Sequence, residues 1–178
     1  DKIKQEYKTM QMQKIKELTN TDVEEEKELI EENRQTKEYL ESVLYSIEIA
    51  KNIDELNEIE LTGYPPHEGV VKTMPSGWGI TCINKDDQTR IYIGRNNKQN
   101  DYIISKLSSD EDLWFHTKDC PGSHVLLKTQ NLTDELIFEC AKLAKENSQG
   151  KNSSKIGVIY TKRKYLRKPP KVNLGYVT

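Results

Sequence analysis

Glycine and proline are both absent from residues 1–62 of this chain. These residues are the strongest breakers of helices, and the segment is instead rich in Glu, Lys, Gln and Leu, which favour them. Residues 1–62 are therefore predicted to be helical, with a break at 19–22, where Thr21 and Glu24 form a capping-box pattern that opens a second helix. A coiled-coil arm or hairpin and a solvated helix packed on the rest of the chain both fit this pattern.

The end of this helical segment carries one narrow apolar stripe at helical spacing, which favours a coiled coil over a globular core. The members of the stripe are Leu40, Val43, Leu44, Ile47 and Ala50. Asn52 is predicted to cap a further short helix that ends at Gly63. The residues of that helix expected to face inward are Ile53, Leu56 and Ile59.

Cysteine is scarce, and long apolar runs are missing. Three cysteines at wide spacing, Cys82, Cys120 and Cys140, do not make a disulfide framework and favour a reducing compartment. No apolar run approaches the roughly 18 residues of a membrane span, and the start lacks the pattern of a signal peptide. From these features we expect a cytoplasmic protein without a membrane partner. The chain opens at Asp1 and not at Met, so we also expect it to be a piece of a longer protein.

Acidic residues are absent from residues 151–178, which hold eight basic ones. The whole chain has a formal net charge of -2, from 27 basic and 29 acidic residues. Residues 1–60 hold 9 of the basic and 17 of the acidic residues, and residues 61–178 hold the remaining 18 and 12. The near-neutral total is therefore the sum of an acidic part and a basic part, which predicts two parts with different roles.

The hydrophobic pattern changes after residues 63–75, which contain Pro65-Pro66 and are predicted to be a linker. Beyond it, residues 76–178 alternate short apolar runs with turns. The predicted fold is α+β, a mostly antiparallel sheet with a packed helix, preceded by the helical coiled-coil arm. The predicted strands are 78–83, 90–93, 113–116, 124–128 and 156–160, with one more near Tyr176. The predicted helices are 100–107 and 133–147, the second capped by Thr133.

The densest group of polar side chains lies in the loop that follows the predicted strand 90–93. It combines two cations with four amides, at Arg95, Asn96, Asn97, Lys98, Gln99 and Asn100. Such groups can bind phosphates, but amides in a loop can equally satisfy neighbouring backbone groups. The residues alone leave both interpretations open.

A second group places three potential zinc ligands at intervals of four residues: His116, Cys120 and His124. Pro121-Gly122 argues against a helix that would align them, and His67 in the linker is no convincing fourth ligand. Ser123 lacks the Gly-x-Ser-x-Gly context of a nucleophile elbow. We therefore expect histidines that hydrogen-bond structurally or contact a partner, with no metal, no cofactor and no catalytic residue.

A third group is a basic segment at residues 160–171, in which cations alternate with tyrosines. Its cations include Lys162, Arg163, Lys164, Arg167 and Lys168. Cations can neutralise phosphates and tyrosines can stack on unpaired bases, so the segment favours nucleic-acid binding. An ordinary basic edge strand, protected from unwanted pairing, is the alternative.

Three stretches carry a resemblance to a known family. They are Tyr92-Ile-Gly-Arg-Asn-Asn-Lys-Gln-Asn-Asp-Tyr102, Leu113-Trp-Phe-His-Thr-Lys-Asp-Cys-Pro-Gly-Ser-His-Val125, and Tyr160-Thr161 with the Lys-Pro segment after it. Together they resemble the NFACT-R domain of the RqcH/NEMF family, whose bacterial members are often labelled fibronectin-binding proteins. The resemblance covers about residues 76–178, and the acidic stretch before it resembles the end of the family's coiled-coil region. Ile159 departs from the pattern, because an acidic residue often precedes Tyr-Thr there.

The resemblance implies an RNA-binding domain, not an enzyme, with a role in ribosome-associated quality control. Members of the family bind large ribosomal subunits obstructed by peptidyl-tRNA, recruit tRNA and promote C-terminal alanine tailing of the stalled chain. The expected partners are thus the large subunit and tRNA, and the helical arm is a candidate for dimer contacts. By the resemblance, the RNA-contact candidates are Arg95, Asn96, Asn97, Lys98 and Gln99 with Trp114, His116, Lys118 and His124. Asn100 and the basic segment complete the predicted site.

An alternative function comes from the label attached to these relatives. A module with that label would bind fibronectin at the cell surface as an adhesin. No residue pattern in the sequence favours it, so RNA binding is the preferred prediction.

Overall fold

The computed structural model describes residues 2–59, 79–168 and 177–178. The chain divides into two compact units, Asp1–Glu38 and Tyr39–Thr178. The predicted linker 63–75 and the predicted strand near Tyr176 lie outside the described residues. The predicted α+β class, with a helical arm before an antiparallel sheet, is confirmed.

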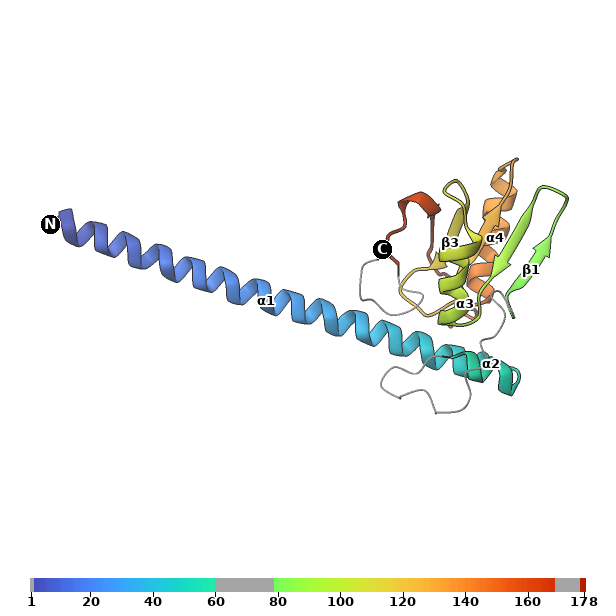
Figure 1. Cartoon of the computed structure of the whole chain (residues 1–178), viewed down its shortest axis with the longest axis horizontal. Coiled ribbons are helices and arrows are strands. Elements are labelled where there is room, and N and C mark those ends of the chain that lie inside the picture. The colour runs from blue at the N-terminus through green and yellow to red at the C-terminus, as the bar shows by residue number, and fades with distance from the viewer. Residues whose placement is uncertain (1, 60–78, 169–176) are drawn as a thin grey trace. The chain divides into compact units, whose positions relative to one another are not determined.

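Helix α1 runs without interruption over Lys2–Ile49 (Figure 1). The predicted break at 19–22 is therefore wrong. Thr and Asn lower helix propensity there by only a fraction of a kcal/mol each, far less than Gly or Pro would. Within the first unit, Arg34 reaches Glu31 at 2.5 Å and also pairs with Glu38, which are the i±3 and i±4 contacts that support a solvated helix.

The last turns of α1 bury a face that shares only Val43 with the predicted stripe. Tyr39, Val43 and Ser46 are buried, whereas three members of the predicted stripe are exposed: Leu40, Leu44 and Ile47. The buried face lies against polar groups, since Ser42 Oγ lies 3.1 Å from Asn97 Oδ1. Apolar spacing alone placed Val43 correctly but did not select Tyr39 or Ser46, which are also buried.

Helix α2, Ile53–Glu58, follows α1 after a short turn. Its predicted cap is confirmed, because Asn52 Oδ1 accepts the backbone N–H of Glu55 at 2.9 Å. The helix ends before Ile59, earlier than predicted, and Gly63 lies outside the described residues. Leu56 was expected to face inward, but it is exposed.

Among the described residues, five antiparallel strands form one sheet in the order β1-β2-β4-β3-β5. The strands are β1 Thr81–Asn84, β2 Arg90–Ile93, β3 Leu113–Thr117, β4 Val125–Lys128 and β5 Val158–Lys162. The sequence placed all five, although β1 and β5 begin two or three residues later than predicted. After the short helix η2, Arg163–Tyr165, the backbones of Arg167 and Thr178 exchange hydrogen bonds of 2.7 and 2.9 Å.

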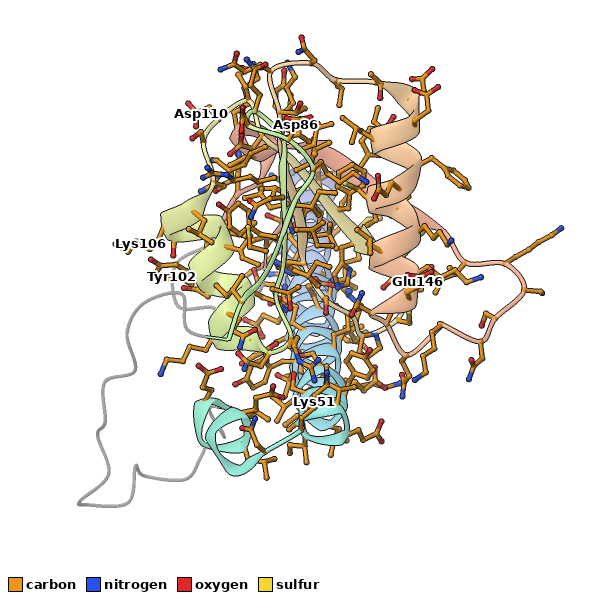
Figure 2. The ribbon with its side chains drawn as sticks, turned by 90° about the vertical axis from the view of Figure 1, so that its right-hand side faces the viewer. Lys51, Asp86, Tyr102, Lys106, Asp110 and Glu146 are labelled. Carbon is orange, nitrogen blue, oxygen red and sulfur yellow. The ribbon has the colours of Figure 1, made fainter. Side chains whose placement is uncertain are left out.

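Helix α4, Asp134–Glu146, covers one face of the sheet (Figure 2). Thr133 caps it as predicted. Between the helix and the strands lies a core of fully buried side chains that includes Ile91, Phe115, Val125 and Cys140. Phe115 also stacks on Tyr160, with ring centroids 5.4 Å apart. Burying an apolar side chain of this size contributes about 1.5–3 kcal/mol.

Helix α3, Asn97–Tyr102, and the π-helical turn η1, Ile103–Leu107, cover the other face (Figure 2). Ile103, Ile104, Trp114 and Leu126 make the core on that side. The helix begins three residues before the predicted start, and Asn96 is its cap. The sheet is thus the middle of three layers. No helix in the part of the chain that the structure describes is long and apolar enough to cross a membrane.

Candidate nucleic-acid interface

The amides of the loop at residues 94–100 are engaged in local hydrogen bonds. Asn96 Oδ1 accepts the N–H of Gln99 at 2.9 Å, and Gln99 Oε1 accepts the N–H of Arg95 at 3.0 Å. Asn100 Oδ1 accepts the N–H of His124 at 3.2 Å, which ties the loop to the start of β4. Asn96, Gln99 and Asn100 are all buried. The local satisfaction of backbone groups, one of the two sequence interpretations, is thus realised in this loop.

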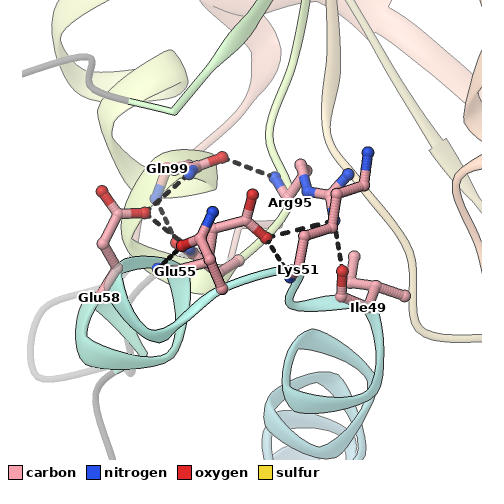
Figure 3. A network of polar contacts seen from close by, with 8 residues as sticks. Ile49, Lys51, Glu55, Glu58, Arg95 and Gln99 are labelled. Carbon is pink, nitrogen blue, oxygen red and sulfur yellow. Dashed lines mark hydrogen bonds and ion pairs between the residues drawn. The ribbon is translucent and has the colours of Figure 1, made fainter.

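The donor ends of two of these amides converge on one carboxylate of α2 (Figure 3). Asn96 Nδ2 and Gln99 Nε2 donate to Oε2 of Glu58 at 3.0 and 2.7 Å. Glu58 is only 5% exposed. A buried carboxylate is costly unless hydrogen bonds compensate for the lost water, and the two amides supply that compensation.

Arg95 lies beside a second carboxylate of the same helix (Figure 3). Its Nη2 is 3.3 Å from Glu55 Oε2 and also donates to the carbonyl of Ile49. Glu55 Oε2 accepts the backbone N–H of Lys51 at 2.9 Å as well. Two acidic residues of α2 therefore bind one cation and two of the four amides that the sequence singled out for phosphate, while Lys98 is exposed.

Two donors of the loop have no hydrogen-bond partner in the described protein. They are Nε of Arg95 and Nδ2 of Asn97, and both atoms are buried. Unsatisfied buried donors are uncommon in folded proteins, and a ligand or an ordered water is the usual explanation. The loop therefore has more donor capacity than α2 uses.

The predicted aromatic candidates form a cluster on the α3 face of the sheet. The Trp114 and His116 rings stack with centroids 5.8 Å apart, and His124 meets both rings edge to face. Trp114 and His124 are buried and His116 is half-buried. Nε1 of Trp114 and Nδ1 of His124 have no protein partner among the described residues.

Burial decides the charge of these histidines. Desolvation lowers the pKa of His124 well below its ordinary value, and the neighbouring His116 lowers it further. Desolvation also lowers the pKa of His116, against the opposing effect of hydrogen bonds with the backbone of Thr117 and Gly122. Both rings are therefore neutral at pH 7 and cannot serve as cations for phosphate. Within the described ranges, no group of three or more His, Cys, Asp or Glu side chains could hold a metal ion.

The cations of the predicted basic segment are mostly paired with acids from elsewhere in the chain. Lys162 and Lys164 both bind Glu111 at 2.6 Å, and these hydrogen bonds lower the pKa of Glu111 to about 2. Lys168 pairs with Asp101. Arg163 donates to the carbonyl of Ile104 at 2.9 Å, so it holds the fold together. Arg167 is exposed, and no ion pair is recorded for it in the described ranges.

The sheet separates the predicted candidates into two groups. At one end, which we call the loop end, β2 and β3 finish and β4 and β5 begin, as the pairings Ile93↔Val125 and Thr117↔Val158 show. The loop carrying Lys98 and the residues from Lys118 to His124 emerge at this end. Lys162 lies opposite Leu113 at the other end, beside Glu111. The structure therefore places Lys162 and Lys164 away from the first loop, whereas Lys168 returns to α3 through its pairing with Asp101.

Two loops at the loop end carry exposed cations, of which the sequence analysis selected only Lys118. We call residues 118–122 and 149–157 the lysine loops. They lie side by side, because Lys118 N donates to the Gly157 carbonyl at 2.8 Å and Gln149 N donates to the Pro121 carbonyl at 2.9 Å. The loop after Glu146 projects from the body of the domain (Figure 2). The exposed lysines of the two loops are Lys118, Lys151 and Lys155.

The lysine loops contain one acid, Asp119, and no ion pair is recorded for their lysines within the described residues. Lys98 emerges at the same end of the sheet and is also exposed. The only sequence signal for Lys151 and Lys155 was the absence of acidic residues from 151–178. The loop end is therefore the exposed cationic region that best fits contact with phosphates.

Comparison with known proteins gives three findings. Residues 80–177 match the family described as NFACT protein RNA binding domain. A protein named Rqc2 homolog RqcH from Streptococcus suis is 38% identical over 171 residues, which make up 92% of this chain and 29% of that protein. The Rqc2 homolog RqcH of Bacillus subtilis is 36% identical over 113 residues, 64% of this chain and 18% of that protein. The chain thus spans less than a third of the length of these relatives.

A solved structure has a similar fold. It is described as the C-terminal of the fibronectin/fibrinogen-binding protein from Streptococcus suis. The match has a TM-score of 0.74 and 32% sequence identity, and it covers 89% of this chain and 66% of that chain.

Proposed function

Because the chain belongs to the family of NFACT protein RNA binding domains, we propose that it binds RNA through the exposed lysines at the loop end of its sheet. The observation that carries this proposal is the gathering of Lys98, Lys118, Lys151 and Lys155 at one end, without recorded ion pairs among the described residues. Lysines of this kind bind the phosphate backbone whatever the base sequence.

The wider role follows from the relatives. Proteins named Rqc2 homolog RqcH are similar to this chain over most of its length. We infer that the chain acts, within a longer cytoplasmic protein, in ribosome-associated quality control. Its RNA partners would be tRNA and the large ribosomal subunit, and it would support the recruitment of tRNA for C-terminal alanine tailing. The domain would contribute binding and no catalysis.

The buried candidates hold the surrounding backbone in place. Asn96, Gln99 and Asn100 fix the loop from which Lys98 emerges, and Arg163 fastens the segment after β5 to η1. Lys162 and Lys164 lie at the opposite end, and Glu111 neutralises part of their charge. We propose that Lys162 and Lys164 contribute less to RNA affinity than the lysine loops do.

The test compares two triple variants of the 178-residue chain. One replaces the three lysines of the lysine loops, Lys118, Lys151 and Lys155, with alanine. The control replaces three exposed cations outside the loop end: Arg90, Lys106 and Lys142. The affinity for a fluorescent single-stranded RNA is measured at several salt concentrations, with unfractionated tRNA as a competitor.

The lysine-loop variant should lose affinity, and the slope of log K against log salt should fall by about 0.7 for each phosphate contact removed. The control variant has the same change in net charge and should bind much as the unaltered chain does. Equal loss in the two variants would mean that overall charge, and not the loop end, attracts RNA. Salt-independent binding would contradict phosphate contact altogether.

A second candidate function is binding of fibronectin. It is favoured by the similar solved structure, which is described as part of a fibronectin/fibrinogen-binding protein. Surface plasmon resonance on immobilised fibronectin, with the same two triple variants, separates the candidates. Saturable binding to fibronectin together with no binding to RNA would support the second function against the first.

A further inference from the structure

Both acidic side chains of α2 that meet the loop at residues 94–100 bind groups suited to phosphate. The guanidinium of Arg95 pairs with Glu55, and the amide N–H groups of Asn96 and Gln99 bind Glu58. Carboxylate and phosphate oxygens accept hydrogen bonds from the same donors, and charge-assisted bonds of this kind are the strong ones. The loop is therefore an anion site that already contains an anion of the same chain.

The fit between this site and its present occupant is incomplete. Nε of Arg95 and Nδ2 of Asn97 are buried and find no acceptor among the described groups. Each glutamate meets the loop through one oxygen, Oε2, whereas a phosphodiester could offer the loop both of its non-bridging oxygens. A phosphate in this place could satisfy donors that α2 leaves without partners.

Helix α2 has little stability of its own. It has six residues, and isolated helices shorter than about 12 residues are marginal in water. Its described support consists of the Asn52 cap, the contact of Glu55 with the backbone of Lys51, and the contacts with the loop. The contacts that hold α2 on the loop are thus the same contacts that a phosphate would replace.

We propose that Glu55 and Glu58 are internal substitutes for RNA phosphates, so that α2 closes the loop at residues 94–100 until RNA displaces it. The proposal rests on the proposed function and adds its regulation. The lysine loops bind RNA first, because their cations are exposed. Arg95, Asn96 and Gln99 then exchange the carboxylates of α2 for phosphates, which makes full binding dependent on the release of α2.

Glu55 also has a capping role, so the test must separate charge from helix capping. Glutamine at positions 55 and 58 keeps the size of both side chains and an oxygen acceptor but removes the negative charges. The double variant Glu55→Gln/Glu58→Gln of the 178-residue chain is therefore compared with Glu25→Gln/Glu28→Gln. The control makes the same change in net charge at exposed positions of α1.

A second variant weakens α2 without any change of charge. Asn52→Ala removes the cap of α2 and touches neither the loop nor its ligands. All four proteins are titrated with a fluorescent single-stranded RNA at several salt concentrations. Hydrogen exchange of residues 53–59 is followed with and without RNA, and thermal unfolding checks that each variant is folded.

We expect Glu55→Gln/Glu58→Gln to bind RNA about fivefold more tightly than the control, as loss of a competing partly exposed ion pair predicts. Asn52→Ala should shift affinity in the same direction. RNA should speed hydrogen exchange at residues 53–59 of the unaltered chain, because α2 leaves the loop when RNA binds.

The proposal is wrong if RNA affinity is unchanged in both variants and the amides of α2 exchange hydrogen no faster when RNA is bound. In that case α2 stays on the loop in the RNA complex. The proposed RNA function would survive that result, provided that the lysine-loop variant still loses affinity. If no protein binds RNA, both the function and the exchange of carboxylate for phosphate are wrong. If a variant is unfolded at the temperature of the titration, hydrogen exchange of residues 53–59 in the unaltered chain, with and without RNA, tests the proposal instead.

Discussion

The imidazole rings of His116 and His124 meet edge to face, with their centroids 5.3 Å apart. Because burial lowers the pKa of both rings, the folded chain carries them neutral, whereas the unfolded chain protonates them below about pH 6.5. Their contribution to stability is therefore complete above pH 6.5 and declines as the pH falls below it. We expect a loss of up to about 1.4 kcal/mol per pH unit for each histidine.

Urea unfolding between pH 7 and pH 5 measures this dependence. His124→Gln should lower the free energy of unfolding at pH 7, because Gln fits the buried site poorly, but should also reduce the slope against pH. An unaltered slope in this variant would show that His124 is not the group that takes up the proton.

Gly94 has no room for a side chain. A Cβ atom there would collide with Oδ1 of Asn100 and would lie 3.1 Å from the Asn100 backbone nitrogen and 3.0 Å from Cδ1 of Ile103. Because Asn100 Oδ1 holds the N–H of His124, it cannot move without losing that bond. Gly94→Ala should therefore destabilise the fold by about 1–3 kcal/mol in chemical denaturation.

Gly157 provides the matched control. The nearest atom to a Cβ at this position is Cβ of Lys118 at 3.5 Å, an ordinary contact distance. Gly157→Ala should change the free energy of unfolding by no more than about 0.5 kcal/mol. Equal effects of the two substitutions would contradict the steric argument.

Glu111 should titrate far below an ordinary glutamate. The hydrogen bonds from Lys162 and Lys164 lower its pKa to about 2, so its carboxylate should show no NMR titration between pH 3 and pH 6. The associated stabilisation is present above the ordinary pKa of about 4.5 and is lost as the pH falls towards 2. Lys162→Ala/Lys164→Ala should return the titration to near 4.5, while either single variant should return it only in part.

The three cysteines should react in the order of their exposure. Cys82 is exposed, Cys120 is half-buried and Cys140 is buried. Burial raises the pKa of Cys140 to about 12, and the thiolate is the nucleophile, so this thiol should be inert in the folded state. Iodoacetamide labelling followed by mass spectrometry should modify Cys82 first and Cys140 only after unfolding. Cys82→Ser should remove the fast phase and leave the others unchanged.

Much of the sheet could be predicted because its strands are marked by local signals. Arg90–Ile93 has the expected bounds, and the cap at Thr133 places the start of α4 correctly. Such features can be predicted because backbone preferences and helix capping depend on residues that are close together in the sequence. The face of α1 could not be predicted in the same way. Its packed side includes the half-buried Ser42, whose hydroxyl donates to Asn97 Oδ1, 55 residues further along the chain.

The same limit applies to the candidate site. The composition of residues 94–100 fitted phosphate binding and local backbone bonding equally well, and only the position of Glu58 shows where the amide donors go. Lys162 and Lys164 looked like free cations because Glu111 lies some fifty residues earlier. Long-range pairing of charges leaves no mark in local composition, so a basic segment cannot be equated with a basic surface.

The strand order has a kinetic consequence. β3 lies between β4 and β5, and β5 is the last strand in the part of the chain that the structure describes. While the chain is being synthesised, one edge of β3 lacks its partner until residues 158–162 have emerged, and Phe115 lacks the ring of Tyr160. Contacts between distant segments slow folding, because the loop between them must be closed first. The sheet is thus completed late, and a nascent chain that stops before β5 would expose a strand edge open to aggregation.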